Sequence, residues 1–263
     1  MQLYLRFIKN AVQRIFYYRA NAFTKILGKV LYLYIQISIW NALFLGNTAS
    51  MAGRSREMTV TYVILSSIIA CGVEFSTIEL MNHKIRTGEI AIDLIRPYNM
   101  LFFSFCDGLG ENLVNICLQG VPLLLLSRVL WHFELPLDLR LPAFLLSILL
   151  GMLVSFLVAY FIGLLAFWLL VTWPLNMFMR AVYQIFSGAW IPVWLFPEQL
   201  KNIAFLFPFQ CIYYTPLTIL TGNVGRQEIL RLLLIQLLWV AIMLTATEYA
   251  WQCGRRKLAV QGG

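Results

Sequence analysis

The sequence predicts an all-α polytopic membrane protein with six transmembrane helices, and three observations support this fold class. Hydrophobic residues make up 60% of the 263 residues and charged residues only 12%, whereas soluble domains are nearer half apolar. Six apolar stretches approach or exceed the roughly 20 residues that a helix needs to cross a bilayer. Most of the basic residues also fall on one predicted side of the membrane, as the positive-inside rule requires. We expect one transmembrane domain over residues 1–263.

The predicted spans are residues 24–45, 58–81, 101–127, 141–171, 176–196 and 227–251. An even number of spans puts both termini on the same side. The basic clusters near both termini favour the cytoplasm for that side, because the inverted arrangement would place them outside. The net charge of +8 therefore reflects membrane orientation, and no basic run is long enough to follow a nucleic acid backbone.

Residues 1–23 are predicted to form an amphipathic helix at the cytoplasmic interface. Leu5, Ile8 and Val12 recur on one side of such a helix, and Arg6 and Lys9 on another, which is typical of helices that lie in the plane of a membrane surface. The alternative is a solvated arm, which would expose the aromatic side chains of this segment to water.

Residues 187–222 are unlike the other predicted outer connections, which are short. Four of the nine prolines lie in this segment, at positions 192, 197, 208 and 216, yet the segment is strongly apolar. Prolines break helices, and irregular backbone at membrane depth is tolerated only where protein or water covers it. We expect a re-entrant outer helical hairpin between the fifth and sixth spans. An ordinary loop with interfacial aromatic residues is the alternative.

Residues 82–100 form the long charged insert between apolar blocks, and its core reads HKIRTGEIAIDLIRPYN from His83 to Asn99. We expect a short helix that begins near Thr87 or Gly88, with a glutamate in its first turn and a proline that ends it. Apolar residues at helical spacing would make one edge with charged residues beside it. The predicted docking surface comprises Thr87, Gly88, Glu89, Ile90, Asp93, Leu94, Ile95, Arg96 and Pro97. A solvated loop between two spans is the alternative.

The run GEIAIDLIRPY after a hydrophobic span resembles the intracellular coupling loop of ABC-2-type transporter permeases, the membrane-spanning subunits of bacterial ABC exporters, and is most similar to an uncharacterised subgroup. The segment 187–222 is similar to the paired re-entrant helices of that family, and the six-span layout extends the resemblance over the whole chain. The resemblance implies a multi-pass protein of the bacterial cytoplasmic (inner) membrane.

The resemblance also implies the partners and the activity. The coupling loop would rest in a groove of a separate ATP-binding subunit, present in two copies that hold ATP and Mg, and two permeases, identical or related, would meet to form a path. Family members export amphipathic or hydrophobic substrates such as drugs, lipids, lipid-linked glycans or peptides. The residues of this chain do not select among these substrates.

A polar stripe recurs every four residues on the third predicted span, at Asp107, Glu111, Asn115 and Gln119. A charge near the bilayer centre costs about 2.5–3.5 kcal/mol on insertion scales, so carboxylates within a span need an explanation. Glu111, Asn115 and Gln119 are predicted to line a hydrated pathway. Hydrogen bonding between helices is an equally good interpretation, and Asp107 fits a place at the cytoplasmic boundary.

Glu74 and Glu79 lie toward the cytoplasmic end of the second predicted span, and Glu79 precedes His83 by four residues, so these two can pair along one helix. A position at the interface is the simpler interpretation of both glutamates, and a gate is the other. On the fourth span, small residues at spacing four predict a ridge that lets other elements approach closely. The ridge comprises Ala143, Ser147, Gly151, Ser155, Ala159 and Gly163.

Catalytic signatures are not found in the sequence. There is no GxxxxGK[ST] phosphate loop, the two histidines His83 and His132 lie on opposite predicted sides, and the five cysteines include no CxxC pair. We therefore expect no catalytic residue, metal or cofactor on this chain, and ATP hydrolysis on another chain. Two alternatives stay open: a membrane anchor or sensor subunit without a pathway, and a lipid-modifying enzyme with Asp107 and Glu111 as acid and base.

Overall fold

The computed structural model describes residues 19–46, 50–51, 53–73, 77–95, 99–135, 138–169, 173–222 and 224–261. Residues 1–18, most of the predicted interfacial helix, lie outside the described residues, as do Glu74, Arg96 and Pro97.

The described chain consists of helices, one small β-hairpin and the turns between them. The elements in chain order are α2 (Arg19–Gly46), β1 (Ser50–Met51), β2 (Arg54–Ser55), α3 (Arg56–Val73), α4 (Thr77–Thr87), α5 (Glu89–Ile95), α6 (Met100–Asn115), the π-helical turn η1 (Ile116–Gly120), α7 (Val121–Trp131), α8 (Leu141–Leu164), η2 (Leu165–Phe167), α9 (Trp173–Phe186), η3 (Val193–Leu195), α10 (Glu198–Leu206), η4 (Pro208–Cys211), α11 (Tyr214–Thr221) and α12 (Arg226–Gln261). The strands β1 and β2 pair antiparallel.

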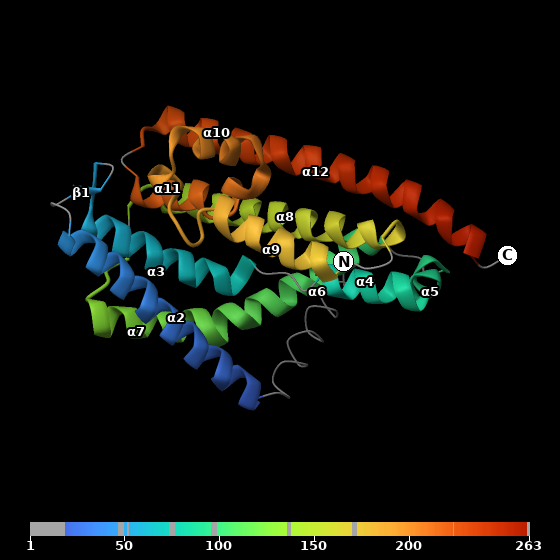
Figure 1. Ribbon diagram of the computed structural model, residues 1–263, viewed down its shortest axis with the longest axis horizontal. Coiled ribbons are helices and arrows are strands. Elements are labelled where there is room, and N and C mark those ends of the chain that lie inside the picture. Colours follow the sequence, from blue (N-terminus) through green and yellow to red (C-terminus); the bar gives the residue numbers. More distant parts are fainter. Residues whose placement is uncertain are drawn as a thin grey trace.

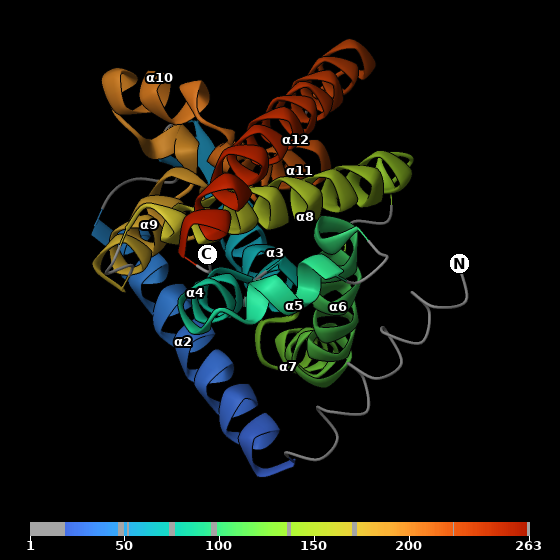
Figure 2. The same ribbon diagram turned by 90° about the vertical axis from the view of Figure 1, so that its right-hand side faces the viewer.

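The two ends of the bundle carry different elements (Figure 1). The corner between α4 and α5 lies at the same end as the C-terminal part of α12, whereas β1 and the start of α12 lie at the other end. Figure 2 looks from the first of these ends and shows α3 and α8 between α12 on one side and α2 and α7 on the other. Both α3 and α8 carry long runs of buried residues, so they form the core of the bundle.

Five helical segments are long and apolar enough to cross a membrane: Thr24–Leu45, Arg56–Thr87, Met100–Trp131, Leu141–Phe167 and Arg226–Lys257. In the second of these, α3 and α4 are the described parts, and residues 74–76 between them lie outside the described residues. The five segments coincide with the first four predicted spans and the last. The predicted all-α polytopic membrane fold is thereby confirmed.

The fifth predicted span, residues 176–196, is wrong as a single helix. The helix α9 has 14 residues and ends at Phe186. Gly188 then adopts a left-handed conformation with φ +82°, which glycine reaches without steric cost. The Ser187 carbonyl accepts a hydrogen bond from the Tyr214 backbone N–H at 3.1 Å, so a distant segment takes the place of the next helical turn.

The small-residue ridge on α8 is confirmed as a surface of close approach. A Cβ atom added at Gly151 would lie 3.1 Å from the Cys211 carbonyl oxygen, and one at Gly163 would lie 2.8 Å from the Met81 Cβ. The Ser155 hydroxyl donates to the Val73 carbonyl at 2.8 Å. The ridge therefore receives α3, α4 and η4 at different heights.

Within residues 187–222, η4 returns to the interior of the bundle. The fully buried Gln236 of α12 donates from Nε2 to the Cys211 carbonyl at 2.8 Å and to the Ser147 carbonyl at 3.0 Å, and Ser147 Oγ donates to Gln236 Oε1 at 2.8 Å. Gln236 lies ten residues beyond Arg226, or about 15 Å along α12. The segment between α10 and α11 therefore packs in the interior of the bundle, about 15 Å from the end at which α12 begins.

Candidate functional site

The predicted short helix is present as α5, which begins at Glu89, just after the expected start near Thr87 or Gly88. The preceding helix α4 runs to Thr87, so the two helices meet in a corner that the sequence did not predict. Gly88 makes the turn with φ +79°, and its carbonyl accepts a hydrogen bond from the Ala91 N–H at 3.0 Å. Thr87 Oγ1 donates to the His83 carbonyl at 2.9 Å. Leu94 belongs to α5, but its side chain is outside the described part.

The inner side of this corner is fastened to the bundle. Ile90 is fully buried and belongs to an apolar cluster with Met81 of α4, Tyr160 of α8 and Ala250 of α12. The prediction that Ile90 forms part of an outward docking edge is wrong. Periodicity identifies residues that share a helix face, but it does not say which face meets the rest of the protein.

Asp93 is also buried, and its predicted place on the docking surface is wrong. Lys84 Nζ donates to Asp93 Oδ2 at 2.7 Å, with side-chain exposures of 16% and 7%. The ammonium also lies 5.7 Å from the centre of the Phe103 ring. The pair joins α4 to α5 inside the corner, because burying either charge alone would be costly.

The outer side of the corner presents a different set of residues. Glu89 is exposed, and its carboxylate lies 3.9 Å from His83 Nδ1. Ile92 is 57% and Ile95 is 85% exposed, and Thr87, Gly88 and Ala91 are exposed as well. Ile92 was missing from the predicted docking surface, although its position two residues after the buried Ile90 would have identified it once one face was known to be inside.

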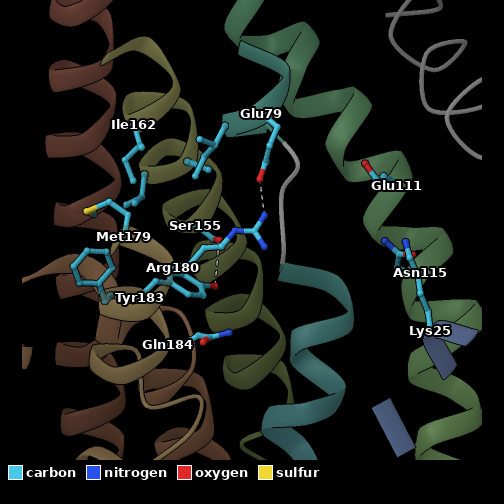
Figure 3. A pocket seen from close by; sticks show the side chains of 14 residues that line it. Lys25, Glu79, Glu111, Asn115, Ser155, Ile162, Met179, Arg180, Tyr183 and Gln184 are labelled. Carbon is cyan, nitrogen blue, oxygen red and sulfur yellow. Dashed lines mark hydrogen bonds and ion pairs between the residues drawn. The ribbon is translucent and has the colours of Figure 1, made fainter. Parts of the chain in front are cut away.

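A cavity of about 390 Å³ lies between the helices (Figure 3). It brings together three predicted site residues: Glu79 of α4, and Glu111 and Asn115 of α6. The described residues that line it are Lys25, Ile78, Glu79, Glu111, Asn115, Ser155, Val158, Ala159, Ile162, Met179, Arg180, Tyr183, Gln184 and Phe209. The possible gate and two members of the polar stripe thus face one space.

The rest of the stripe does not line this cavity. Gln119 is buried and donates from Nε2 to Asn115 Oδ1 at 2.9 Å. The wider turn of η1 begins directly after Asn115, so the hydrogen bond crosses the junction between two helix types. Asp107 is also absent from the lining residues. The stripe is therefore divided: Glu111 and Asn115 line the cavity, whereas Gln119 is hydrogen-bonded along its own helix and not to a neighbouring helix.

The spacing of four residues suggested that Glu79 pairs with His83. In the structure, Glu79 pairs with Arg180 instead. Arg180 Nη2 donates to Glu79 Oε1 at 2.6 Å, and the dashed line in Figure 3 marks this contact across the cavity. The two residues are 101 positions apart in the sequence, so no local pattern indicates the pair.

Two further contacts connect residues that line the cavity. The hydroxyl groups of Ser155 and Tyr183 lie 3.4 Å apart, and the Tyr183 ring contacts that of Phe209 edge to face, with 6.4 Å between centroids. These residues come from α8, α9 and η4. Within the part of the chain that the structure describes, no group of three or more His, Cys, Asp or Glu side chains is placed to hold a metal ion.

A comparison with protein families supplies the context for this geometry. The model of a family described as ABC-2 family transporter protein matches residues 30–262, which include the α4–α5 corner, most of the cavity lining and all of the segment that contains η4. No curated protein matches the chain in a sequence comparison. Because the family match covers most of the chain, the chain belongs to the ABC-2 transporter family and is an ABC-2-type permease, the membrane component of an ABC transporter.

Proposed function

We propose that this chain is the permease subunit of an ATP-driven exporter for an amphipathic or hydrophobic substrate. It pairs with a second permease, identical or related, and two separate ATP-binding subunits hold ATP and Mg and carry out hydrolysis. The observation that carries the proposal is the α4–α5 corner. Its inner side is packed against α8 and α12 through Ile90, while Ile92 and Ile95 are exposed on its outer side.

This corner suits the transmission of movement from a bound subunit. Exposed apolar side chains beside a charged residue such as Glu89 are typical of a protein contact surface. The buried pair of Lys84 and Asp93 makes α4 and α5 move together. A partner that shifts α5 therefore also shifts α4, which carries Glu79 at the cavity.

The proposed topology has six spans with both termini in the cytoplasm of a bacterial cell. The α4–α5 corner and the C-terminal part of α12 lie at the same end of the bundle (Figure 1). Arg255, Arg256 and Lys257 lie near the end of α12, and such a cluster favours the cytoplasmic side of an inner membrane.

The fifth span in this proposal is α9 completed by the segment that follows it. With 14 residues, α9 is about 21 Å long and shorter than the roughly 30 Å of a hydrocarbon core. The segment from Ser187 to Gly222 is the re-entrant outer hairpin, supported by the hydrogen bonds from Gln236 that hold η4 inside the bundle. Glu111, Asn115 and Glu79 lie along the transport path, with Glu79 as a gate.

Purification of the tagged permease from its native membranes tests the proposal. We expect an ABC ATP-binding subunit and ATPase activity to co-purify with the wild type. The double variant Glu89→Lys with Ile95→Asp should lose most of that activity without a change in permease yield, since both side chains are exposed. The matched control is Glu198→Lys with Leu200→Asp on α10. Equal ATPase recovery from both double variants would refute the coupling role of the corner.

A further inference from the structure

The lining of the cavity sorts into polar groups of both charges and an apolar surface (Figure 3). Among its described residues two are basic, Lys25 and Arg180, and two are acidic, Glu79 and Glu111. They come from four different helices, α2, α9, α4 and α6. This arrangement brings opposite charges from separate elements to one space.

The balance of charges bears on what the cavity binds. An ion of one sign would be attracted by half of these groups and repelled by the other half. A group that carries both signs finds a complementary partner for each. Arg180 and Glu79 show that both signs are already held within hydrogen-bonding distance here, at 2.6 Å.

The volume and the apolar surface of the cavity further limit which ligands it can bind. A volume of about 390 Å³ lies at the lower end of the range of small-molecule sites, about 300–1,000 Å³. It has room for one head group and is too small for an extended glycan or a folded peptide. Ile162 of α8, Met179 of α9 and Phe209 of η4 supply apolar contacts for the first carbons of an attached chain.

On the basis of the proposed function, we propose that this cavity binds the zwitterionic head group of the transported amphipath. The acidic part of the head group lies near Lys25 and Arg180, and its amine lies near Glu79 and Glu111. Charge-assisted hydrogen bonds then hold both ends of the head group, while a single acyl chain continues along the apolar surface.

Four probes with one 16-carbon chain each test the head group. They are palmitoyl lysophosphatidylethanolamine, which is zwitterionic, palmitoyl lysophosphatidylglycerol, which is anionic, hexadecylamine, which is cationic, and monopalmitoylglycerol, which is neutral. Each is added in maltoside micelles to the purified permease with its co-purified partners, and the rise in the midpoint of thermal unfolding reports binding. We expect the wild type to be half-saturated by the zwitterion at a mole fraction about tenfold lower than by any other probe.

Two variants should change which probe binds best, one toward the cationic probe and the other toward the anionic probe. Neither variant alters the ion pair of Arg180 and Glu79. Lys25→Gln leaves an excess negative charge and should favour hexadecylamine, whereas Glu111→Gln should favour the anionic probe. Lys201→Gln and Glu198→Gln on α10 lie outside the cavity lining and should keep the wild-type order.

A wild type that does not prefer the zwitterion overturns the proposal, and so do variants that both keep the wild-type order. If a variant does not fold, the order in which the four probes bind to the wild type still tests the proposal. Failure of the ranking while an ATP-binding subunit is present refutes only the substrate class. A wild-type preparation without that subunit refutes the proposed function instead.

Discussion

Arg180 on α9 donates a hydrogen bond to Glu79 on α4 across 2.6 Å, and this ion pair joins helices that are far apart in the sequence. The side chains are 67% and 51% exposed. Screening by solvent therefore limits the contribution of the pair to about 0–1 kcal/mol. Its significance is geometric, because α4 continues through Gly88 into the α4–α5 corner. In the function proposed above, a movement of that corner moves Glu79 relative to Arg180.

Breaking this pair should affect coupling more than stability. We expect Glu79→Gln and Arg180→Gln to change the unfolding free energy by less than about 1 kcal/mol and to reduce substrate-stimulated ATPase activity severalfold in the reconstituted complex. The exchange of both residues, Glu79→Arg with Arg180→Glu, should restore part of the activity. Glu228→Gln, which removes an exposed pair with Arg231 on α12, is the control. An equal loss of activity in that control would contradict a gating role.

The pair of Lys84 and Asp93 should behave in the opposite way, because it is buried. Lys84→Met removes the ammonium group that contacts the carboxylate of Asp93, and we expect a loss of about 3–5 kcal/mol in the unfolding free energy. The double variant Lys84→Met with Asp93→Leu should recover much of this loss. Thermal unfolding of the purified permease measures both. Glu89→Gln, which removes the exposed contact with His83, should leave the unfolding free energy unchanged. A loss of stability in this variant as large as that in Lys84→Met would contradict the argument that burial makes the Lys84–Asp93 pair important.

Cysteines introduced into a cysteine-free background should separate the members of the third-span stripe. We expect Glu111→Cys and Asn115→Cys to react with a small polar thiol reagent, since both positions line the cavity. The rate should change when ATP binding shifts the conformational population. Val114→Cys, at a buried position, and Leu113→Cys, outside the cavity lining, should stay unreactive. If neither Glu111→Cys nor Asn115→Cys reacts in any nucleotide state, the cavity is not part of the transport pathway.

The orientation in the membrane is open to a direct test in intact cells. Glu57→Cys at the start of α3 and Gln199→Cys on α10 should react with an impermeant reagent from outside, since both are exposed at the proposed outer end. Thr87→Cys, exposed at the α4–α5 corner, should react only after the membrane is permeabilised. Labelling of Thr87→Cys from outside would invert the proposed topology.

Two glycines with different surroundings test the close packing of α8. A Cβ at Gly163 would lie 2.8 Å from the Met81 Cβ, so we expect Gly163→Ala to cost about 1–3 kcal/mol in unfolding free energy. At Gly28 in α2, an added Cβ would have no atom within 4 Å apart from its chain neighbours and the backbone of its own helix, and Gly28→Ala should be neutral or stabilise by up to about 1 kcal/mol. Equal unfolding midpoints for the two variants would show that α4 is not held against the ridge.

Local patterns in the sequence determined much of the fold. Five of the six predicted spans coincide with long helices, because a run of about 20 apolar residues has few alternatives in a bilayer. The small residues of α8 were identified by their spacing of four, and the beginning of α5 by its glycine and glutamate. Each of these signals lies within one helix or one turn.

The tertiary structure decided which sides of these helices meet. The same spacing that placed Ile90 and Asp93 near Glu89 could not show that α8 and α12 cover Ile90, or that Lys84 reaches Asp93. Just after α9, the Ser187 carbonyl accepts a hydrogen bond from the distant Tyr214 backbone N–H, a contact that no local pattern indicated. The cavity depends on Arg180 meeting Glu79, a contact between elements that no local pattern connects. Periodicity fixes the relative directions of side chains within one element, whereas their partners are fixed only when separate elements pack together.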